Sequence, residues 1–182
     1  MGGGRGRGAD AVTRALALVA LLAVAAIGVV AIEPGWYLRL RYPLEHEQIV
    51  LGHARNYALE PALLAAVIYE ESRFRADARS DEGALGLMQL LPETAEGIAE
   101  RTGGSRFEVG DLLDPEINVR YGSWYLRHLI GKYGNVRTAL AAYNGGQGNV
   151  DRGVLFAETR EYVDNVLDTR DVYARAYPQL RR

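Results

Sequence analysis

The sequence of 182 residues contains no cysteine. This absence excludes disulfide bonds, thiolate metal sites and a lipid-modified cysteine. An excess of charge is lacking too, because 21 basic side chains are balanced by 23 acidic ones, for a net charge of −2. The composition therefore offers no basic surplus that would indicate nucleic acid as a partner.

Motifs for metal or phosphate chemistry are also missing. The histidines at positions 46, 53 and 128 are scattered, and no H-E-x-x-H zinc motif occurs. Gly146-Gln147-Gly148 follows an expected helix, whereas a phosphate-binding loop usually follows a strand. The sequence therefore predicts neither a metal nor another cofactor. No internal repeat is evident, and the length suits one domain with an appendage.

One long hydrophobic run lies near the N-terminus. Ala15–Ile32 contains only Ala, Val, Leu, Ile and one Gly, and as a helix it would extend roughly 27 Å, close to the hydrocarbon thickness of a bilayer. Arginines before the run and Trp36-Tyr37 after it are typical of a membrane segment whose N-terminus is cytoplasmic. We expect a single-pass protein of the cytoplasmic membrane, with a cytoplasmic tail over 1–14, a transmembrane anchor over 15–37, a linker over 38–43 and an extracytoplasmic domain over 44–182.

A cleaved signal peptide is the alternative interpretation of this run. Ala23-Val24-Ala25 has the small-x-small form of a cleavage site. Cleavage there would leave residues 27–32 as an exposed apolar tail, which favours the uncleaved anchor. The sequence leaves the choice open.

The remainder is typical of helices that begin near prolines. Four prolines each precede a helical pattern: Pro43, Pro61, Pro92 and Pro115. Asp114 is a suitable N-cap for a helix that stops at Gly134, and Asn135 caps the next helix, which Gly145-Gly146 ends. Alternation with a period of two is not evident. We therefore predict an all-α domain, with at most a short β excursion near residues 80–89.

Glu71 stands out within this helical pattern. Large apolar side chains fall on one arc of the helix that starts at Pro61: Leu63, Leu64, Val67, Ile68 and Phe74. Glu71 lies near the middle of that arc, whereas acids normally lie opposite an apolar stripe. Such a glutamate is either paired or held in place for chemistry, and for an isolated case pairing is the more common outcome.

A loop with two glycines follows the helix. It runs from Ser80 through Gly83 and Gly86 to Leu87-Met88-Gln89. Glycine permits positive φ and close backbone approach, which suits a wall against a ligand. An apolar pocket with one acid, the neighbouring hydroxyl of Ser72 and the Gln89 amide as a donor would suit a saccharide.

The pattern E-S-x-F-x-x-x-A-x-S-x-x-G-A-x-G-L-M-Q-L-x-P-x-T-A, from Glu71 to Ala95, resembles the signature of the soluble lytic transglycosylase (SLT) domain family of the lysozyme-like superfamily. Residues 118–126 fit its N-x-x-x-G-x-x-Y-L helix. Residues 142–146 resemble its A-Y-N-x-G motif, and residues 158–163 its E-T-R-x-Y-V motif. The matches extend over about residues 58–177.

The resemblance implies a compact lysozyme-like helical domain, α+β at most, that acts on the glycan strands of peptidoglycan as a lytic transglycosylase, a lyase. It implies that Glu71 is the catalytic acid and base. It also implies roles for four other residues: Gln89, Tyr143 and Asn144 line the glycan cleft, and Tyr162 approaches the catalytic carboxyl. Met88 would belong to the same wall.

A second catalytic acid is not evident in the sequence, although ordinary glycosidases use two carboxylates. Asp77 and Asp81 fall in a polar segment where solvated charges are expected. The resemblance implies a mechanism with one acid that ends in a 1,6-anhydro product. A lysozyme-like muramidase that uses water, and a non-catalytic glycan-binding subunit of an envelope assembly, are the alternatives.

One segment departs from the family pattern. Members often have a longer connection with a tryptophan and a proline ahead of the E-T-R motif. Gly145–Ala157 is short and has neither residue. One wall of the expected cleft is therefore undefined by the sequence.

Overall fold

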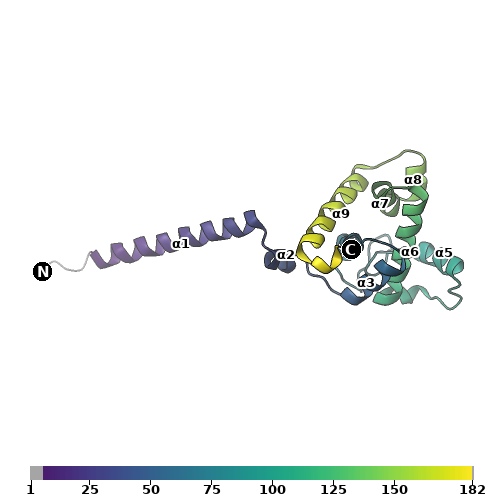
Figure 1. Cartoon of the computed structure of the whole chain (residues 1–182), viewed down its shortest axis with the longest axis horizontal. Helices are drawn as coiled ribbons and strands as arrows, with labels where there is room; N and C mark the ends of the chain where they lie inside the picture. The colour runs from purple at the N-terminus through teal and green to yellow at the C-terminus, as the bar shows by residue number, and fades with distance from the viewer. Residues whose placement is uncertain (1–5, 182) are drawn as a thin grey trace. The chain divides into compact units, whose positions relative to one another are not determined.

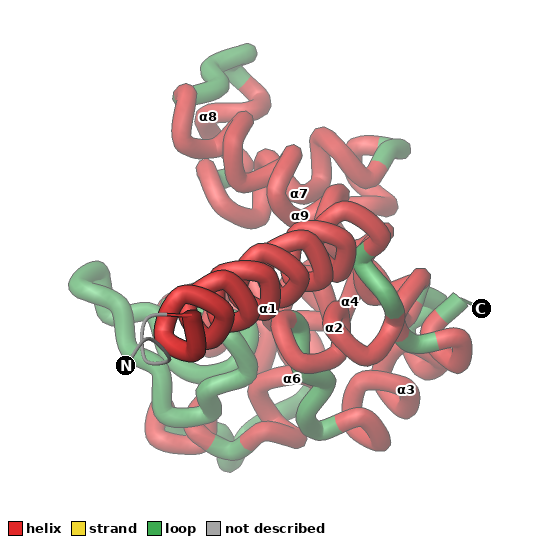
Figure 2. Tube along the Cα trace, turned by 90° about the vertical axis from the view of Figure 1, so that its left-hand side faces the viewer, coloured by secondary structure: helices red, strands yellow, loops and turns green. Residues whose placement is uncertain are grey.

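The computed structural model describes residues 6–181, in two units that divide between Arg41 and Tyr42. Figures 1 and 2 show helices joined by loops, and no strand occurs in the described part of the chain. The β-type pairing found there is limited to two isolated bridges, Arg79 with Leu85 and Leu85 with Leu90. The predicted all-α architecture is therefore confirmed, and the two bridges lie close to the short β excursion expected near residues 80–89.

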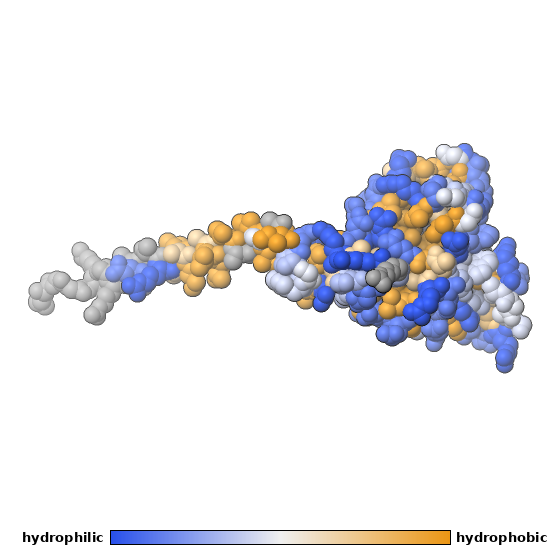
Figure 3. Space-filling model, viewed as in Figure 1, coloured by the Kyte–Doolittle hydropathy of each residue, from blue (hydrophilic) through white to orange (hydrophobic). Residues whose placement is uncertain are grey.

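The first unit contains α1 (Gly6–Ile32) and α2 (Gly35–Arg41). Apolar side chains on α1 are exposed, as its orange surface in Figure 3 shows. Over the described residues, no single helix is long and apolar enough to cross a membrane, although residues 14–30 and α2 pass that test together as a bent pair. Much of the expected linker is helical, because α2 continues to Arg41.

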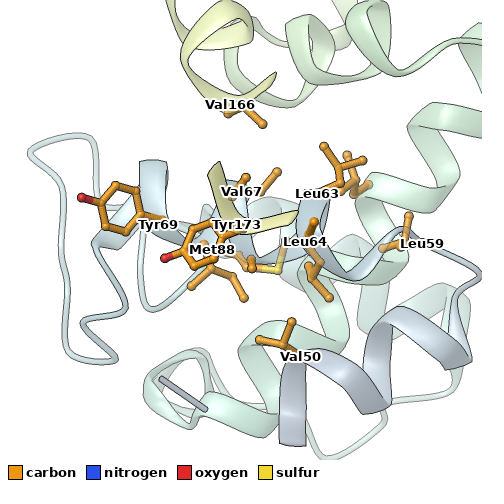
Figure 4. Packing of buried hydrophobic residues seen from close by; sticks show 14 of the residues in the cluster. Val50, Leu59, Leu63, Leu64, Val67, Tyr69, Met88, Val166 and Tyr173 are labelled. Carbon is orange, nitrogen blue, oxygen red and sulfur yellow. The ribbon is translucent and has the colours of Figure 1, made fainter. Parts of the chain in front are cut away.

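The second unit is built around α4 (Pro61–Ser72). Its other helices are α3 (Glu47–Asn56), α5 (Pro92–Thr102), η1 (Val109–Leu113), α6 (Pro115–Tyr133), α7 (Val136–Gly145), α8 (Gln147–Asp151), α9 (Ala157–Ala176) and η2 (Pro178–Leu180). Both α9 and α3 pack against α4, and α6 packs against α3 and α7. Figure 4 shows side chains from α3, α4 and α9 meeting in one core.

Three of the four predicted helix starts at prolines are confirmed. Pro61, Pro92 and Pro115 each occupy the first turn of a helix. The Asp114 side chain caps α6 by accepting hydrogen bonds from two backbone N–H groups, and α6 ends where Gly134 adopts φ 74°. These boundaries follow from local geometry, which the sequence alone specifies.

The predicted start at Pro43 is wrong, because α3 begins only at Glu47. The intervening chain is held instead by two tyrosines of the C-terminal region. The Tyr173 hydroxyl donates to the Pro43 carbonyl at 2.8 Å, and the Tyr177 hydroxyl accepts from the Leu44 amide at 3.1 Å. These contacts fix the segment in a non-helical conformation.

The burial of α4 is wider than the single apolar arc predicted for it. Every residue from Pro61 to Tyr69 is buried. The reason is that α9, from the far end of the sequence, packs against α4 in addition to α3. Glu71 lies in the last turn of this helix, where Glu70 and Glu71 are partly buried.

Candidate active site

A cavity of about 650 Å³ opens beside the C-terminal end of α4. Glu71 lines it together with residues of the 80–91 loop, Thr94 of α5, Tyr125 of α6, the end of α7 and the start of α9. Within residues 6–181 we find no group of three or more His, Asp or Glu side chains arranged to hold a metal ion.

The end of α4 sets the position of Glu71. Arg73 and Phe74, which directly follow the helix, have φ values of 54° and 61°. Two successive non-glycine residues in the left-handed region cost about 1–2 kcal/mol each. Such strain commonly occurs at functional sites, where the surrounding packing maintains it. Here the buried Phe74 ring anchors the turn, and the chain leaves the helix immediately after Glu71.

The Glu71 carboxyl is largely desolvated and accepts a hydrogen bond from Tyr162. The Tyr162 hydroxyl donates to Glu71 Oε1 at 2.6 Å. Burial raises the pKa of Glu71 from 4.5 to about 7, an effect that the Tyr162 bond partly offsets and the neighbouring Glu70 charge reinforces. Near neutral pH a substantial fraction of Glu71 is therefore protonated and able to act as an acid.

Glu70 lies next to Glu71 in sequence but in a different environment. The Thr169 hydroxyl of α9 donates to Glu70 Oε1 at 2.6 Å, and Arg73 lies 3.4 Å from the other oxygen. Glu70 is thus a glutamate with structural partners. Glu71 is the one whose carboxyl lines the cavity. The two neighbouring glutamates therefore have different surroundings.

Asn118 of α6 organises the loop that lines the cavity together with Glu71. Its side chain is fully buried, accepts from the Met88 amide at 2.7 Å, and donates to the carbonyls of Leu85 and Leu112, both at 2.8 Å. Gly86 has φ 78°, and a Cβ there would collide with the Asn118 side chain and the Leu112 carbonyl. Glycine is therefore required at this position both for conformation and for space.

Side chains from two further helices hold the same loop. The Ser72 hydroxyl, at the end of α4, lies 2.8 Å from the Leu87 carbonyl and 3.1 Å from that of Ile68. The Tyr143 hydroxyl of α7 donates to the Met88 carbonyl at 2.7 Å. The loop is therefore fixed relative to Glu71 by contacts from α4, α6 and α7.

Comparison with known protein families identifies the domain formed by the second unit. The model of the Transglycosylase SLT domain family matches residues 48–163. The chain belongs to this family. The expected family relationship, stated above from the motifs, is therefore confirmed.

Relatives of this SLT domain include lytic murein transglycosylases of several bacteria. A soluble lytic murein transglycosylase of Escherichia coli K12 is 31% identical over 159 residues, which cover 78% of this chain and 24% of the relative. A membrane-bound lytic murein transglycosylase F of Serratia proteamaculans is 34% identical over 131 residues, which cover 65% of this chain and 25% of the relative. The chain thus spans about a quarter of the length of these curated relatives.

The fold is shared with solved structures of the same family. An inactive mutant of the lytic transglycosylase Slt from Pseudomonas aeruginosa matches with a TM-score of 0.71 and 32% identity, over 87% of this chain and 29% of that one. A complex of the 70-kDa soluble lytic transglycosylase with bulgecin A matches with the same TM-score, 30% identity, and coverage of 76% and 25%. The expected lysozyme-like helical fold is therefore confirmed.

Four of the residues predicted for the site of the SLT domain line the cavity: Glu71, Gln89, Tyr143 and Asn144. Gln89 differs in detail from the expectation, because its side-chain nitrogen donates to the carbonyls of Ala78 and Gly86. The amide nitrogen, expected to donate to a sugar, thus stabilises the loop, and the amide oxygen is the group left for a ligand.

Ser72 and Met88 do not have the positions expected of substrate-binding side chains. Neither is among the described residues that line the cavity, and both side chains are buried. Ser72 bonds to backbone carbonyls, as described above. The Met88 side chain lies in the core (Figure 4) and packs against Gly122 of α6, where a Cβ would collide with it. Both side chains therefore hold the loop against the core of the domain and do not face the cavity.

Other residues at the cavity were not singled out from the sequence. Phe156, with 52% of its surface exposed, lines the wall that the short segment before α9 left undefined. Glu82 and Glu158 add two carboxylates to the lining, whereas the sequence suggested no second acid at the site. The E-T-R motif contained Glu158, but only packing of α9 beside α7 brings it to the cavity.

Proposed function

We propose that this SLT-domain protein is a membrane-anchored peptidoglycan lytic transglycosylase. It would cleave the β-1,4 bond between N-acetylmuramic acid and N-acetylglucosamine and form 1,6-anhydro-N-acetylmuramic acid. The observation that carries the proposal is the Glu71 carboxyl, with a pKa of about 7 and the Tyr162 hydroxyl at 2.6 Å, in the wall of a 650 Å³ cavity. The named activities of the relatives support it.

In the first step Glu71 acts as a general acid. The Tyr162 hydroxyl donates to one oxygen of the carboxyl, so the proton is carried by the other. That proton passes to the glycosidic oxygen, the bond from this oxygen to C1 breaks, and N-acetylglucosamine leaves with a free hydroxyl. The acetamido oxygen of the substrate attacks C1 from the opposite face and replaces a protein nucleophile.

In the second step Glu71 acts as a general base. Its carboxylate removes the proton of the C6 hydroxyl, and the C6 oxygen attacks C1 as the acetamido oxygen leaves. The products are the anhydro sugar and a protonated Glu71, ready for the next cycle. Water is not consumed. The buried Tyr162 hydroxyl keeps its proton, because burial raises its pKa well above 10, and it stabilises the carboxylate between the steps.

The anchor is the second part of the proposal. Residues 15–37 would hold the protein in the cytoplasmic membrane, with the tail 1–14 inside and the SLT domain outside. Exposed apolar side chains on α1, such as Leu18 and Leu22, and the name of the membrane-bound transglycosylase F relatives support it.

Product analysis tests the enzymatic proposal. The full-length protein in detergent is incubated with purified murein, and the released muropeptides are analysed by mass spectrometry. We expect anhydro-muropeptides from the parent protein and about 10²–10⁴-fold less release from Glu71→Gln, since that variant cannot transfer the proton. The matched control is Glu70→Gln, which we expect to remain active.

A muramidase is the alternative function, because Glu82 and Glu158 also line the cavity and either carboxylate could activate a water. Products with reducing-end muramic acid and no anhydro sugar would establish it and exclude the transglycosylase. Murein binding without any release, in the parent protein as in Glu71→Gln, would point to a non-catalytic glycan-binding subunit.

A further inference from the structure

A second cavity, of about 320 Å³, lies between the ends of α3 and α5 and the side of α6. Tyr57 lines it directly after α3, Thr102 and Gly103 line it at the end of α5, and Arg120 and Trp124 line it from α6. None of its described lining residues belongs to the Glu71 cavity. Its volume is within the range of about 300–1,000 Å³ that is typical of sites for small ligands. It is therefore a candidate site separate from the one at Glu71.

Three hydrogen-bond donors in the lining of this cavity lack a partner. They are the hydroxyls of Tyr57 and Tyr121 and the guanidinium of Arg120, for which no side-chain hydrogen bond or ion pair occurs within residues 6–181. The guanidinium lies 5.2 Å from the centre of the Tyr121 ring. Burial raises the pKa of Tyr57, while the Arg120 charge lowers it and Tyr121 raises it, so both groups lie near the Tyr57 hydroxyl. The three donors are therefore available to one acceptor on a ligand.

Packing holds both tyrosine rings in place. The Tyr57 ring stacks on the His53 imidazole, with centroids 6.0 Å apart and an interplanar angle of 22°, and His53 Nε2 lies 2.8 Å from Glu116 Oε1 of α6. The Tyr121 ring is buried and packs against Phe107, with centroids 5.1 Å apart. The two hydroxyls are thus positioned before a ligand binds, which lowers the entropic cost of binding.

The charge of the cavity favours a ligand with a single negative charge. Arg120 is the one charged side chain among the described residues that line it. A guanidinium binds a carboxylate through two parallel hydrogen bonds, and tyrosine hydroxyls donate to the same kind of oxygen. The indole of Trp124 and the side chain of Ile98 provide apolar surface for the rest of the ligand. A small carboxylate with an apolar part fits these features better than a phosphate, whose second charge would have no cation to pair with.

The lining also favours a ligand whose nitrogen is an amide. A free amino acid carries an ammonium group, and no carboxylate among the described lining residues would pair with it. The C-terminal end of α5 lies at the cavity, and backbone carbonyls in the last turn of a helix have no intrahelical partners. Such carbonyls accept hydrogen bonds from amide N–H groups. The C-terminal residue of a peptide combines this amide with a carboxylate.

We propose that this cavity is a second binding site of the SLT-domain protein and that it takes the C-terminal residue of a short peptide. The carboxylate lies between the guanidinium of Arg120 and the hydroxyls of Tyr57 and Tyr121, and the side chain of the residue packs against Trp124. The peptide is either free or attached to a murein strand, because both sources present the same group. The inference does not depend on the proposed function, since the two cavities share no described lining residue.

A fluorescence titration tests the site. The chain has two tryptophans, so Trp36→Phe leaves Trp124 as the single reporter in the full-length protein in detergent. The probe is N-acetyl-alanyl-alanine, in its L,L and D,D forms, and the comparison ligands are its C-terminal amide and free alanine. We expect one form of the probe to bind at least about tenfold more tightly than either comparison ligand, because the amide lacks the carboxylate and alanine carries an unpaired ammonium.

Two substitutions in the cavity should weaken binding of the probe. We expect Arg120→Gln to weaken it at least about tenfold and Tyr57→Phe to weaken it to a smaller extent. The matched control is Arg127→Gln, which removes the same charge from an exposed position of α6 outside the described lining. Thermal unfolding of both arginine variants checks that the fold is kept. The proposal would be overturned by no saturable binding of the probe, by equal binding of either comparison ligand, or by the same loss in both arginine variants.

Murein strands distinguish the two sources of the peptide. In the full-length Glu71→Gln variant, which leaves strands intact, binding of strands with and without their peptides is compared before and after Arg120→Gln is added. Weaker binding of the peptide-bearing strands alone would identify the strand as the source, and an effect on the free probe alone would identify free peptides. An equal effect on strands without peptides would overturn the proposal. Release of anhydro-muropeptides by the parent is measured separately, and its absence would contradict only the proposed function.

Discussion

At the scale of single residues, the electrostatics of Glu71 carry the function that we propose. Desolvation holds its pKa near 7, the Tyr162 hydroxyl favours the charged form, and the Glu70 charge favours the neutral form. The Thr169 hydroxyl and the Arg73 guanidinium contact the two oxygens of Glu70, so the two neighbouring acids have different partners.

The pH dependence of activity should depend on Tyr162 and Glu70, which have opposite effects on the pKa of Glu71. The first step needs protonated Glu71, so kcat/KM should fall as pH rises through about 7. Tyr162→Phe removes a hydrogen bond that favours the carboxylate of Glu71, so the alkaline limb of the pH profile, where kcat/KM falls, should move to higher pH. Glu70→Gln removes a charge that favours protonation, so the limb should move to lower pH.

The profile is measured by release of soluble muropeptides across the pH range, for the parent and both variants. If the pH at which kcat/KM falls moved in the same direction in both variants, or moved in neither, the proposed effect of these neighbours on the pKa of Glu71 would be contradicted. The opposite signs distinguish this effect from a general loss of stability, which would lower activity without moving the limbs apart.

The stability of the protein should also depend on Glu71. The folded state keeps this proton up to about pH 7, whereas the unfolded chain loses it near 4.5, so the free energy of unfolding falls as pH rises between these values, by about 3 kcal/mol. Glu71→Gln lacks this penalty and should unfold at higher denaturant than the parent at pH 8. The two should be similar near pH 4.

Denaturant unfolding of the full-length protein at several pH values measures the difference. Glu70→Gln serves as the control, since it keeps the buried Glu71 carboxyl and should keep most of the pH dependence. A Glu71→Gln variant that is no more stable than the parent at pH 8 would show that the carboxylate is better solvated than the structure indicates.

At the scale of elements, the loop over residues 80–90 depends on helices that are distant in sequence. Side chains of Ser72, Asn118 and Tyr143 bond to its backbone from α4, α6 and α7. The loop has little regular structure of its own, with isolated bridges only. Its position relative to Glu71 is therefore a property of helix packing.

The two positive-φ glycines of this loop provide a matched pair of substitutions. Gly83→Ala should cost about 1–2 kcal/mol, because φ is 85° but nothing described lies within 4 Å of the added Cβ. Gly86→Ala has the same conformational cost, and in addition the Cβ collides with Asn118 and the Leu112 carbonyl. We expect it to lower the free energy of unfolding by at least about 3 kcal/mol.

Chemical denaturation with both variants measures this difference, and murein release reports whether the loop keeps its position. Gly86→Ala should reduce activity much more than Gly83→Ala does. Equal stability of the two variants would mean that the loop moves away from Asn118 without cost, which the three buried hydrogen bonds of that side chain argue against.

At the scale of the whole molecule, the first and last segments of the second unit contact each other. Residues 42–44 are held by the hydroxyls of Tyr173 and Tyr177, and α9 covers α4. The first residues of the second unit are therefore held by its own C-terminal region. An anchor over residues 15–37 would keep the domain within a short distance of the membrane surface.

A charge in the apolar run tests that anchor. Leu22→Arg should lower membrane insertion by about 2.5–3.5 kcal/mol, because it places a charge near the middle of residues 15–32. We expect less of the protein in the carbonate-resistant membrane fraction, and a tag at the N-terminus should remain in that fraction for the parent. The control is Leu40→Arg, in an exposed position beyond the run. Carbonate extraction of the parent protein from the membrane, or loss of its N-terminal tag, would contradict an uncleaved anchor.

What could be predicted from the sequence is mainly local. Helix starts at Pro61, Pro92 and Pro115, and the cap at Asp114, need only neighbouring residues, so they follow from the sequence itself. Gly86 and the surrounding motif also carry enough information in sequence to identify the SLT family. The failure at Pro43 has the opposite cause, since its partners lie about 130 residues further along the chain.

The sequence by itself determined the family, the helix starts at Pro61, Pro92 and Pro115, and the helix ends at Gly134 and Gly145-Gly146. Only the tertiary structure decided that Ser72 and Met88 turn into the core and that Glu158 and Phe156 reach the cavity. It also decided that Glu70 contacts Thr169 and Arg73, whereas Glu71 accepts a hydrogen bond from Tyr162 and lines the cavity. The physical reason is that exposure and pKa depend on which distant segments pack around a side chain, and no local pattern specifies that packing.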